Sequence, residues 1–172
     1  MGIDFCNTEL PKPVLPNGFW YVSWHESLIE FHADVQHRGF CGEMDSHLFP
    51  TFRQYDGCLR LMQAVSSGSS FTPESSLLIA HGKTQDLVEY VAAVQGVRSS
   101  AENGAIQNIA VVPEYRNRGI GRGLLIGALN GFRNIGVKNV TLEVTADNFA
   151  ATKLYRHIGF STIKIYYREI GK

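Results

Sequence analysis

The sequence predicts one α/β domain, and three observations support that prediction. The chain has 172 residues, within the ~100–200 residues common for a single domain. Hydrophobic residues make up 44% of it, enough for a sizeable core. Runs typical of β-strands alternate with apolar patterns of helical period. We therefore expect a single domain over residues 1–172 that combines a sheet with helices.

The N-terminal half predicts a lead-in, one strand and two helices. Residues 1–17 hold three of the six prolines and predict an extended lead-in. Residues 19–22 are aromatic and β-branched, as in a strand. Ser23 and Ser27 each begin a capping-box pattern, so a helix is expected to start near one of them. A second apolar pattern of helical period covers residues 48–62.

Three strand-like runs with short polar links follow. The first two cover residues 76–80 and 87–97, and the third begins at Ile106 and is cut off by Pro113. Short links between consecutive strands are typical of hairpins. These runs predict an antiparallel meander.

A glycine-rich helix is expected next, ending at residues 134–136. One stripe of this helix has glycine at every fourth residue, namely Gly119, Gly123, Gly127 and Gly131. Each interior glycine costs ~1 kcal/mol relative to alanine. We expect a close approach to the helix backbone, most simply by the sheet beneath it.

The C-terminal part predicts a strand, a short helix and a final strand region. Residues 140–144 are strand-like, and Asp147 or Asn148 is expected to cap the helix that Gly159 ends. Residues 160–170 alternate apolar and polar side chains. This alternation predicts one or two strands.

Composition excludes several classes of protein. Sixteen basic residues balance sixteen acidic ones, whereas nucleic-acid binding normally needs a basic excess. Three widely spaced cysteines, Cys6, Cys41 and Cys58, favour free thiols in a cytoplasm over a disulfide framework or a zinc site. No signal peptide and no apolar run of ~20 residues is visible. The expectation is a cytoplasmic protein.

The turn before the glycine-rich helix predicts an anion site. The first N–H groups of a helix lack intrahelical partners and lie at the positive end of its dipole. A phosphorylated ligand is therefore expected here. A P-loop is excluded because no Gly-Lys-Ser or Gly-Lys-Thr precedes the helix. A Rossmann fingerprint is disfavoured, since Leu124 stands at its third glycine and too few residues follow Glu143 for further βα units.

This region resembles the GNAT superfamily of acetyl-CoA-dependent N-acetyltransferases. The family signature Arg/Gln-x-x-Gly-x-Gly/Ala after a strand is matched by Arg116-x-x-Gly119-x-Gly121. A second signature is matched within residues 142–160 by Asn148, Ala151, Leu154-Tyr155 and Gly159-Phe160. The resemblance covers residues 106–160. It implies a mixed, mostly antiparallel central sheet flanked by helices.

The resemblance also implies where acetyl-CoA binds. Backbone amides of the turn would hold the coenzyme A pyrophosphate, and the splayed strand before it would pair with the pantetheine arm. Asn148 would contact the cofactor, and Tyr155 would stand near its sulfur. The expected cofactor-binding residues are Ile109, Ala110, Val111, Arg116, Asn117, Arg118, Gly119, Ile120, Gly121, Arg122, Asn148 and Tyr155. No metal is expected.

Two side chains are expected to be catalytic. Tyr155 is the candidate acid for the leaving thiolate, since a phenol (pKa ~10) and a thiol (~8.5) differ little. The alternative is that Tyr155 only packs against the sulfur or hydrogen-bonds to it. Glu143 resembles the position of the glutamate base in ribosomal-protein N-terminal alanine acetyltransferases, and the alternative is an ordinary exposed carboxylate. Because no cysteine or serine lies in a nucleophile motif, we expect direct attack by the amine.

The acceptor amine is left open. A protein N-terminus, a lysine and a small amine all remain candidates, and residues 18–64 are expected to form that side of the cleft. Glu43-x-Asp45 could meet a cationic amine, although a solvated acidic turn is the simpler interpretation. The partner is thus an amine acceptor, small molecule or protein, with no nucleic acid or membrane expected and a homodimer left open. The alternative function is a non-catalytic acyl-CoA-binding sensor.

Overall fold

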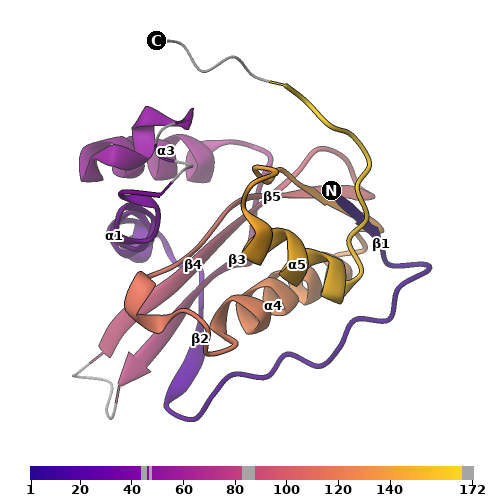
Figure 1. Cartoon of the computed structure of the whole chain (residues 1–172), viewed down its shortest axis with the longest axis horizontal. Coiled ribbons are helices and arrows are strands. Elements are labelled where there is room, and N and C mark those ends of the chain that lie inside the picture. The colour runs from indigo at the N-terminus through magenta and orange to yellow at the C-terminus, as the bar shows by residue number, and fades with distance from the viewer. Residues whose placement is uncertain (44–45, 47, 83–87, 168–172) are drawn as a thin grey trace.

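A mixed six-stranded sheet forms the centre of the computed structural model, which describes residues 1–43, 46, 48–82 and 88–167 (Figure 1). Within these residues the strand order is β1-β6-β5-β4-β3-β2. Neighbouring strands are antiparallel except β5 and β6, which are parallel. The mixed, mostly antiparallel sheet is thereby confirmed. The strands are β1 (Gly2–Asp4), β2 (Phe19–Ser23), β3 (Phe71–Gly82), β4 (Val88–Arg98), β5 (Asn103–Val111) and β6 (Asn139–Leu142).

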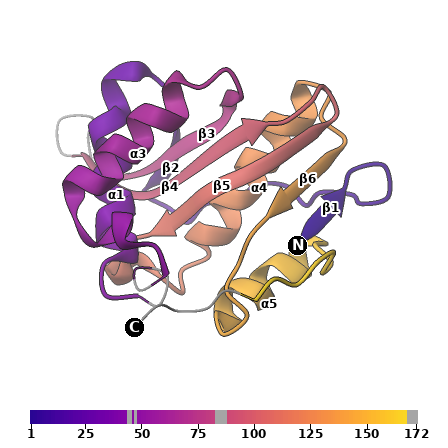
Figure 2. The same ribbon diagram turned by 90° about the horizontal axis from the view of Figure 1, so that it is seen from above.

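Helices cover both faces of the sheet. The helices α1 (Ile29–Phe40) and α3 (Tyr55–Ser67) lie on one face, and α4 (Ile120–Asn134) and α5 (Phe149–Ile158) lie on the other (Figures 1 and 2). A hydrophobic core lies on each face of the sheet, because successive side chains of a strand point to opposite faces. In β3, Leu78 packs with α1 and its neighbour Ile79 packs with α4. Three short 3-10 helices are η1 (Glu26–Leu28), η2 (Pro50–Arg53) and η3 (Pro113–Tyr115). In the part of the chain that the structure describes, no helix combines the length and the hydropathy needed to cross a membrane.

The predicted meander is formed by β3, β4 and β5. A bulge in β5 places Asn108 opposite Gln95 but Ile106 opposite Gly96, so that Gln107 is the extra residue. On its other side β5 pairs with β6 only from Asn103 to Ile106. A bulge increases local twist and bends the strand. Beyond Ile106 the β6-facing edge of β5 therefore has no neighbouring strand among the described residues.

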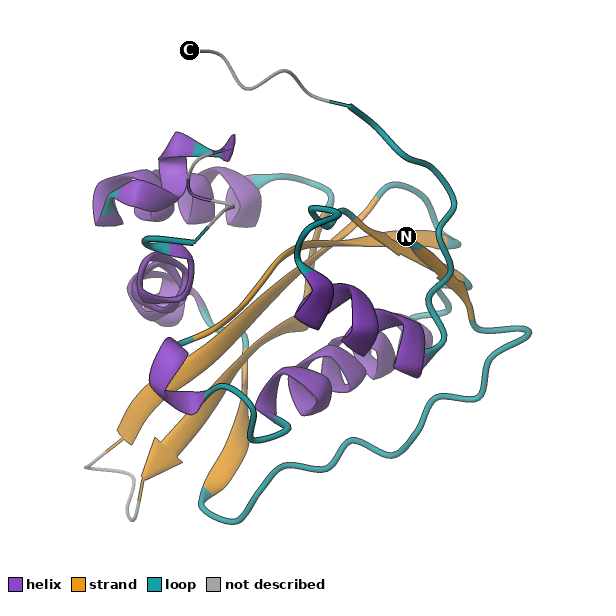
Figure 3. Cartoon of the chain, viewed as in Figure 1, coloured by secondary structure: helices purple, strands orange, loops and turns teal. Residues whose placement is uncertain are grey.

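The glycine stripe of α4 is explained by close approach from three segments. A Cβ atom on Gly131 would lie 1.9 Å from the backbone oxygen of Glu74 in β3. On Gly127 it would lie 2.8 Å from the ring of Tyr21, and on Gly123 it would lie 2.6 Å from Leu15. The sheet is thus one neighbour, as expected, and the lead-in is another. The lead-in runs from β1 around α4 to β2, at the opposite edge of the sheet (Figure 3).

The two ends of the chain differ from the sequence-based expectation. Within the lead-in, residues 2–4 form β1, a strand that was not predicted, and Gly2 pairs with Thr141 of β6. The predicted strands after Phe160 are wrong for residues 162–167, since only Ser161 pairs, as an isolated bridge to Gly2. Both neighbours of β6 in the sheet are already present, namely β1 and β5, so the alternating C-terminal segment cannot pair with β6. Residues 168–170 of that prediction lie outside the described residues.

The helix ends confirm most of the capping predictions. Asn148 caps α5, its Oδ1 accepting a hydrogen bond from the N–H of Ala151 at 3.1 Å. Gly136 and Gly159 both have positive φ at helix ends. The predicted serine cap of the first helix is wrong. His25 caps the intervening η1 by accepting from the N–H of Ser27, and α1 starts after it without a side-chain cap.

Candidate functional site

The turn between η3 and α4 has the geometry of an anion-binding cradle. Gly119 is the N-cap of α4 in the left-handed region (φ 81°), and Asn117 also has positive φ (60°). No side chain caps the helix. The N–H groups of Ile120, Gly121 and Arg122 have no hydrogen-bond partner among the described residues. These amides and the dipole of a 15-residue helix together suit a bound phosphate.

Gly121 marks the place where the two motif regions meet. A Cβ atom on Gly121 would lie 3.5 Å from Cγ2 of Val111 and 3.8 Å from Cδ2 of Leu154. Both distances are ordinary van der Waals contacts, so the protein itself does not require glycine here. The missing side chain instead leaves the amides of the turn open to a ligand. The end of β5, the turn and helix α5 thus converge at one residue.

The three residues predicted to pair with the pantetheine arm end β5. Ile109, Ala110 and Val111 all lie beyond Ile106, where pairing with β6 stops. They remain paired with β4 on their other side. An extended ligand could therefore add to this open edge by backbone hydrogen bonds. Their contact with a cofactor stays a prediction.

The three arginines of the turn differ in their contacts. Arg116 makes three hydrogen bonds inside the protein, to Val111, Glu43 and Gly39. Arg118 is exposed, donates to the backbone oxygen of Glu114 at 3.0 Å and lies over the ring of Tyr115. Arg122 is exposed in the first turn of α4. Among these side chains, Arg118 and Arg122 have their charges nearest to solvent.

The residues predicted to act on the acyl group lie on α5 and just after β6. Tyr155 is 6% exposed and belongs to the core between α4, α5 and the sheet. Its neighbour in sequence, Leu154, is the α5 residue whose Cδ2 would lie 3.8 Å from a Cβ atom on Gly121. Glu143 is exposed and directly follows Leu142, the last residue of β6. The cofactor and catalytic roles of these residues and of Asn148 stay predictions.

A buried polar cluster lies on the opposite face, between α1 and β4. Gln95 donates from Nε2 to Nδ1 of His32 at 2.9 Å, and Gln36 donates to Oε1 of Gln95 at 2.6 Å. Burial lowers the pKa of His32 to about 3, so its imidazole is neutral at physiological pH. Within the described residues, Nε2 of His32, Oε1 of Gln36 and Nδ2 of Asn108 are buried without partners. No local sequence pattern predicts this cluster, because its members are far apart in the chain.

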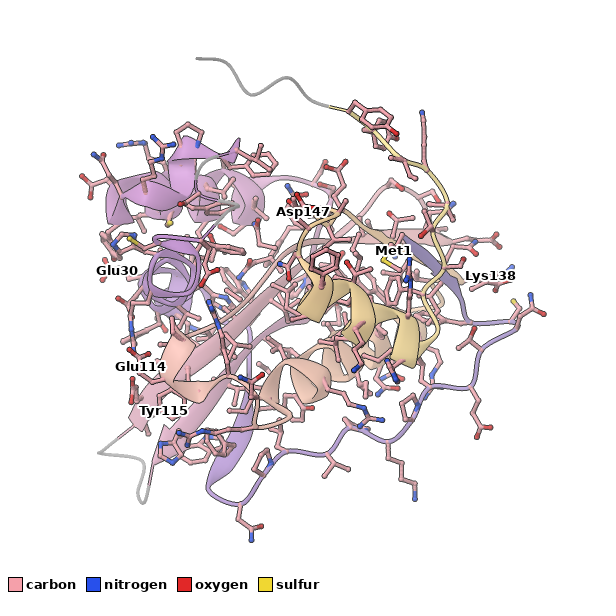
Figure 4. The ribbon with its side chains drawn as sticks, viewed as in Figure 1. Met1, Glu30, Glu114, Tyr115, Lys138 and Asp147 are labelled. Carbon is pink, nitrogen blue, oxygen red and sulfur yellow. The ribbon has the colours of Figure 1, made fainter. Side chains whose placement is uncertain are left out.

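A second polar cluster anchors η3, directly before the cradle. The hydroxyl of Tyr115, labelled in Figure 4, donates to Oε2 of Glu89 at 2.6 Å. Arg38 of α1 holds the other oxygen of Glu89 at 2.6 Å. The hydrogen bond from Tyr115, followed by the contacts of Arg38, lowers the pKa of Glu89. The ring of Tyr115 also packs edge-on against Phe19. The start of the turn is thus fixed to β4, to α1 and to β2.

The acceptor side is described only in part. Asp45 of the acidic turn lies outside the described residues. Glu43, the other carboxylate of that turn, pairs with Arg116 at 2.5 Å. It is therefore not a simple solvated carboxylate.

Known proteins similar to this chain in sequence are acetyltransferases. A family model described as the acetyltransferase (GNAT) family matches residues 43–160. The chain is 37% identical over 71 residues to N-alpha-acetyltransferase 30 of Schizosaccharomyces pombe and 39% identical over 64 residues to the [ribosomal protein bS18]-alanine N-acetyltransferase of Escherichia coli. These matches cover 41% and 37% of this chain, and 47% and 43% of those relatives. The chain therefore spans about half the length of the curated relatives it matches.

The fold is shared with solved structures. A GCN5-related N-acetyltransferase from Sphaerobacter thermophilus superposes with a TM-score of 0.66 at 23% sequence identity. The superposition covers 92% of this chain and 45% of that one. At this identity the likeness concerns the fold alone.

Proposed function

The chain belongs to the acetyltransferase (GNAT) family, and from this we propose that it transfers an acetyl group from acetyl-CoA to a primary amine. The observation that carries the proposal is the convergence at Gly121. The open edge of β5, the uncapped start of α4 and helix α5 meet there. The amides suit the phosphates of a long phosphorylated thioester and the strand edge suits its arm, and we assign Tyr155 of α5 to the sulfur end.

The residues present fit coenzyme A by this geometry. The cradle offers backbone N–H groups that have no partner among the described residues, and neither Gly119 nor Gly121 carries a side chain to fill it. The bound thioester supplies the activated acetyl group. We assign the phosphates to the amides of residues 117–122 and the arm to the edge of residues 109–111. Asn148 fixes the start of α5 as its cap and contacts the cofactor from there.

The acyl transfer needs a proton removed from the amine and a proton delivered to the leaving sulfur. We assign the second step to the hydroxyl of Tyr155, as general acid. We assign the first step to the carboxylate of Glu143, directly or through water, and its exposure supports this assignment. The amine attacks the carbonyl directly, since the chain offers no nucleophile motif for an acyl-enzyme.

The acceptor class we favour is the free α-amine of a peptide or protein. An α-amine (pKa ~8) is about one-tenth neutral at pH 7, whereas a lysine (~10.4) is neutral in fewer than about one molecule in a thousand. An exposed carboxylate is a weak base, and it suits the more acidic amine. The two relatives, an N-alpha-acetyltransferase and an alanine N-acetyltransferase, support the same class.

The acceptor class is tested with three probes at equal concentration. These are a short peptide with a free N-terminal alanine and no lysine, the same peptide N-acetylated with one internal lysine, and a small diamine. Coenzyme A release and the product mass are measured for each. We expect acetylation of the first probe at least about tenfold faster than of the others, given the difference in neutral fraction. Preference for the lysine peptide or the diamine would overturn the α-amine assignment.

The catalytic roles are tested with two conservative variants. Tyr155→Phe should lower kcat about a hundredfold while the Kd for coenzyme A stays within about twofold. Glu143→Gln should lower kcat most at low pH, where less of the amine is already neutral. Full activity of Tyr155→Phe would exclude the general-acid role. Tight coenzyme A binding without acetylation of any amine would instead indicate a sensor.

A further inference from the structure

The side chain of Arg116 is engaged inside the protein on three sides. Its Nε donates to the backbone oxygen of Val111 at 3.1 Å, and one terminal nitrogen donates to the backbone oxygen of Gly39 at 2.7 Å. The other terminal nitrogen pairs with Oε1 of Glu43 at 2.5 Å. The guanidinium thus points to the end of α1, and its Nε and both terminal nitrogens bond to oxygen atoms of the protein.

These contacts connect the cradle to the helix that precedes the acceptor side. Val111 is the last residue of β5, and Gly39 lies in the last turn of α1, where carbonyl groups lack intrahelical partners. The end of α1 also lies directly on β5, because a Cβ atom on Gly39 would be 2.9 Å from Cβ of Ala110. Arg116 therefore bonds to Val111 at the end of β5, to Gly39 in α1 and to Glu43 in the acidic turn after α1.

Glu43 extends this connection into the segment that follows α1. The backbone oxygen of Glu43 accepts hydrogen bonds from both the N–H and the hydroxyl of Ser46, at 3.0 and 2.7 Å. The backbone oxygen of Ser46 in turn accepts from Nε of Arg53 at 2.8 Å. A continuous series of bonds thus runs from Arg116 to η2, directly before α3.

We propose that Arg116 is a positioning residue that fixes the acceptor-side segment to the cofactor turn through Glu43, rather than a side-chain ligand of the phosphates. The proposal rests on the proposed function, which assigns the cofactor to the turn, and on the expectation that residues 18–64 form the acceptor side of the cleft. Glu43 does not receive a cationic amine in this arrangement. Its charge is used by Arg116, and the pair positions Ser46 and residues 48–53 on the acceptor side.

The exposure of this ion pair makes the proposal testable. The side chains of Arg116 and Glu43 are 35% and 45% exposed, and exposed ion pairs contribute little to global stability. Loss of the pair should therefore weaken acceptor binding and loosen the nearby backbone without a large shift in Tm. A second ion pair, between Lys138 and Glu102, serves as a control. Glu102 directly precedes β5, at the end of the strand opposite Val111. Lys138 lies across the molecule from Tyr115 (Figure 4).

The experiment compares Arg116→Gln, Glu43→Gln, the double variant and Glu102→Gln. Kinetics use acetyl-CoA with the N-terminal alanine peptide, and calorimetry gives the Kd for coenzyme A. We expect each single variant to raise the peptide KM about fivefold, with kcat and the coenzyme A Kd within about twofold. The double variant should be no worse than the poorer single variant, since the two residues act through one contact. Glu102→Gln should match the wild type.

A second readout does not depend on the proposed function. Amide hydrogen exchange of Ser46, of residues 48–49 and of residues 51–53 should become faster in Arg116→Gln and Glu43→Gln but not in Glu102→Gln. Faster exchange with no acetylation of any amine would support the positioning role and count against the proposed activity alone. Unchanged exchange would overturn the positioning role. A loss of coenzyme A affinity of about tenfold in Arg116→Gln alone would also overturn it, because the side chain would then be a phosphate ligand.

Discussion

The two faces of the sheet hold their helices by different means. On the α4 face, backbone approaches backbone through missing side chains, as at Gly131 against Glu74. On the α1 face, the contact is made by buried polar side chains, as where Gln95 bonds both His32 and Gln36. Both faces also pack apolar side chains, and Gly39 of α1 closely approaches Ala110 of β5. The α1 face differs from the α4 face in its buried hydrogen bonds, which leave some polar atoms unpartnered among the described residues.

This difference determines how each face tolerates change. A steric contact between backbones has no flexible part, so an added methyl group cannot be accommodated by a rotamer change. A buried polar cluster can be rearranged or hydrated, but it responds to protonation. We therefore expect the α4 face to be sensitive to volume and the α1 face to be sensitive to pH.

The largest effect is expected from Gly131→Ala. The new Cβ atom would lie 1.9 Å from the backbone oxygen of Glu74, which can move away only with β3. We expect the free energy of unfolding to fall by more than about 3 kcal/mol, or the variant not to fold. Soluble yield and urea unfolding measure this. A loss of less than about 1 kcal/mol would show that the α4 face adapts, and the contrast between the faces would disappear.

The next effect concerns His32 and the pH dependence of stability. The folded-state pKa is lowered to about 3, against ~6.5 in the unfolded chain. Between these values the unfolded chain binds a proton that the folded chain does not, so stability is full above the unfolded pKa and falls as pH falls. At pH 5 this histidine should lower stability by about 2 kcal/mol relative to pH 7.5.

The contribution of His32 is isolated by comparison with a variant. His32→Asn keeps an acceptor near the Nδ1 position but does not titrate, so its stability should change less between pH 7.5 and 5, measured by urea unfolding. His25→Asn, at an exposed histidine, serves as the control. Equal pH dependence of wild type and His32→Asn would mean that the buried imidazole is not the pH-sensitive element.

The smallest change in stability is expected at the other end of α4, from Gly121→Ala. The new Cβ atom would meet Val111 and Leu154 at ordinary contact distances, and alanine favours helix by ~1 kcal/mol. Stability should therefore stay constant or rise slightly, while the methyl group occupies the cradle. We expect coenzyme A affinity to fall about tenfold by calorimetry, which corresponds to ~1.4 kcal/mol.

The matched control for Gly121→Ala removes a charge instead of adding volume. Arg122 is exposed in the same helical turn, and Arg122→Ala should weaken coenzyme A binding only about two- to threefold. Gly131→Ala and Gly121→Ala together separate the two uses of glycine on one helix. If Gly121→Ala binds coenzyme A as well as the wild type does, the cradle has been misassigned.

The sequence predicted the features that arise from local backbone rules. The glycine stripe, the meander, the caps at Asn148 and Gly159 and the cradle at Gly119 all leave a residue pattern over a few positions. Features that need a distant partner left no such pattern. The three residues of β1 become a strand only because β6 pairs with them, and the alternating residues 162–167 are not a strand although their pattern is stronger. Likewise, Arg116 was expected at the phosphates, and nothing local indicated its bond to Glu43, 73 positions earlier.

The glycines of α4 also bear on the order in which the chain folds. Four of the 15 residues of this helix are glycine, so α4 has little tendency to form alone. Its neighbours at Gly123, Gly127 and Gly131 belong to residues 14–21 and to β3, far earlier in the sequence. The helix should therefore consolidate late, after the meander is in place. The anion cradle at its first turn would then appear only in the completed fold, and a partly folded chain would not capture coenzyme A.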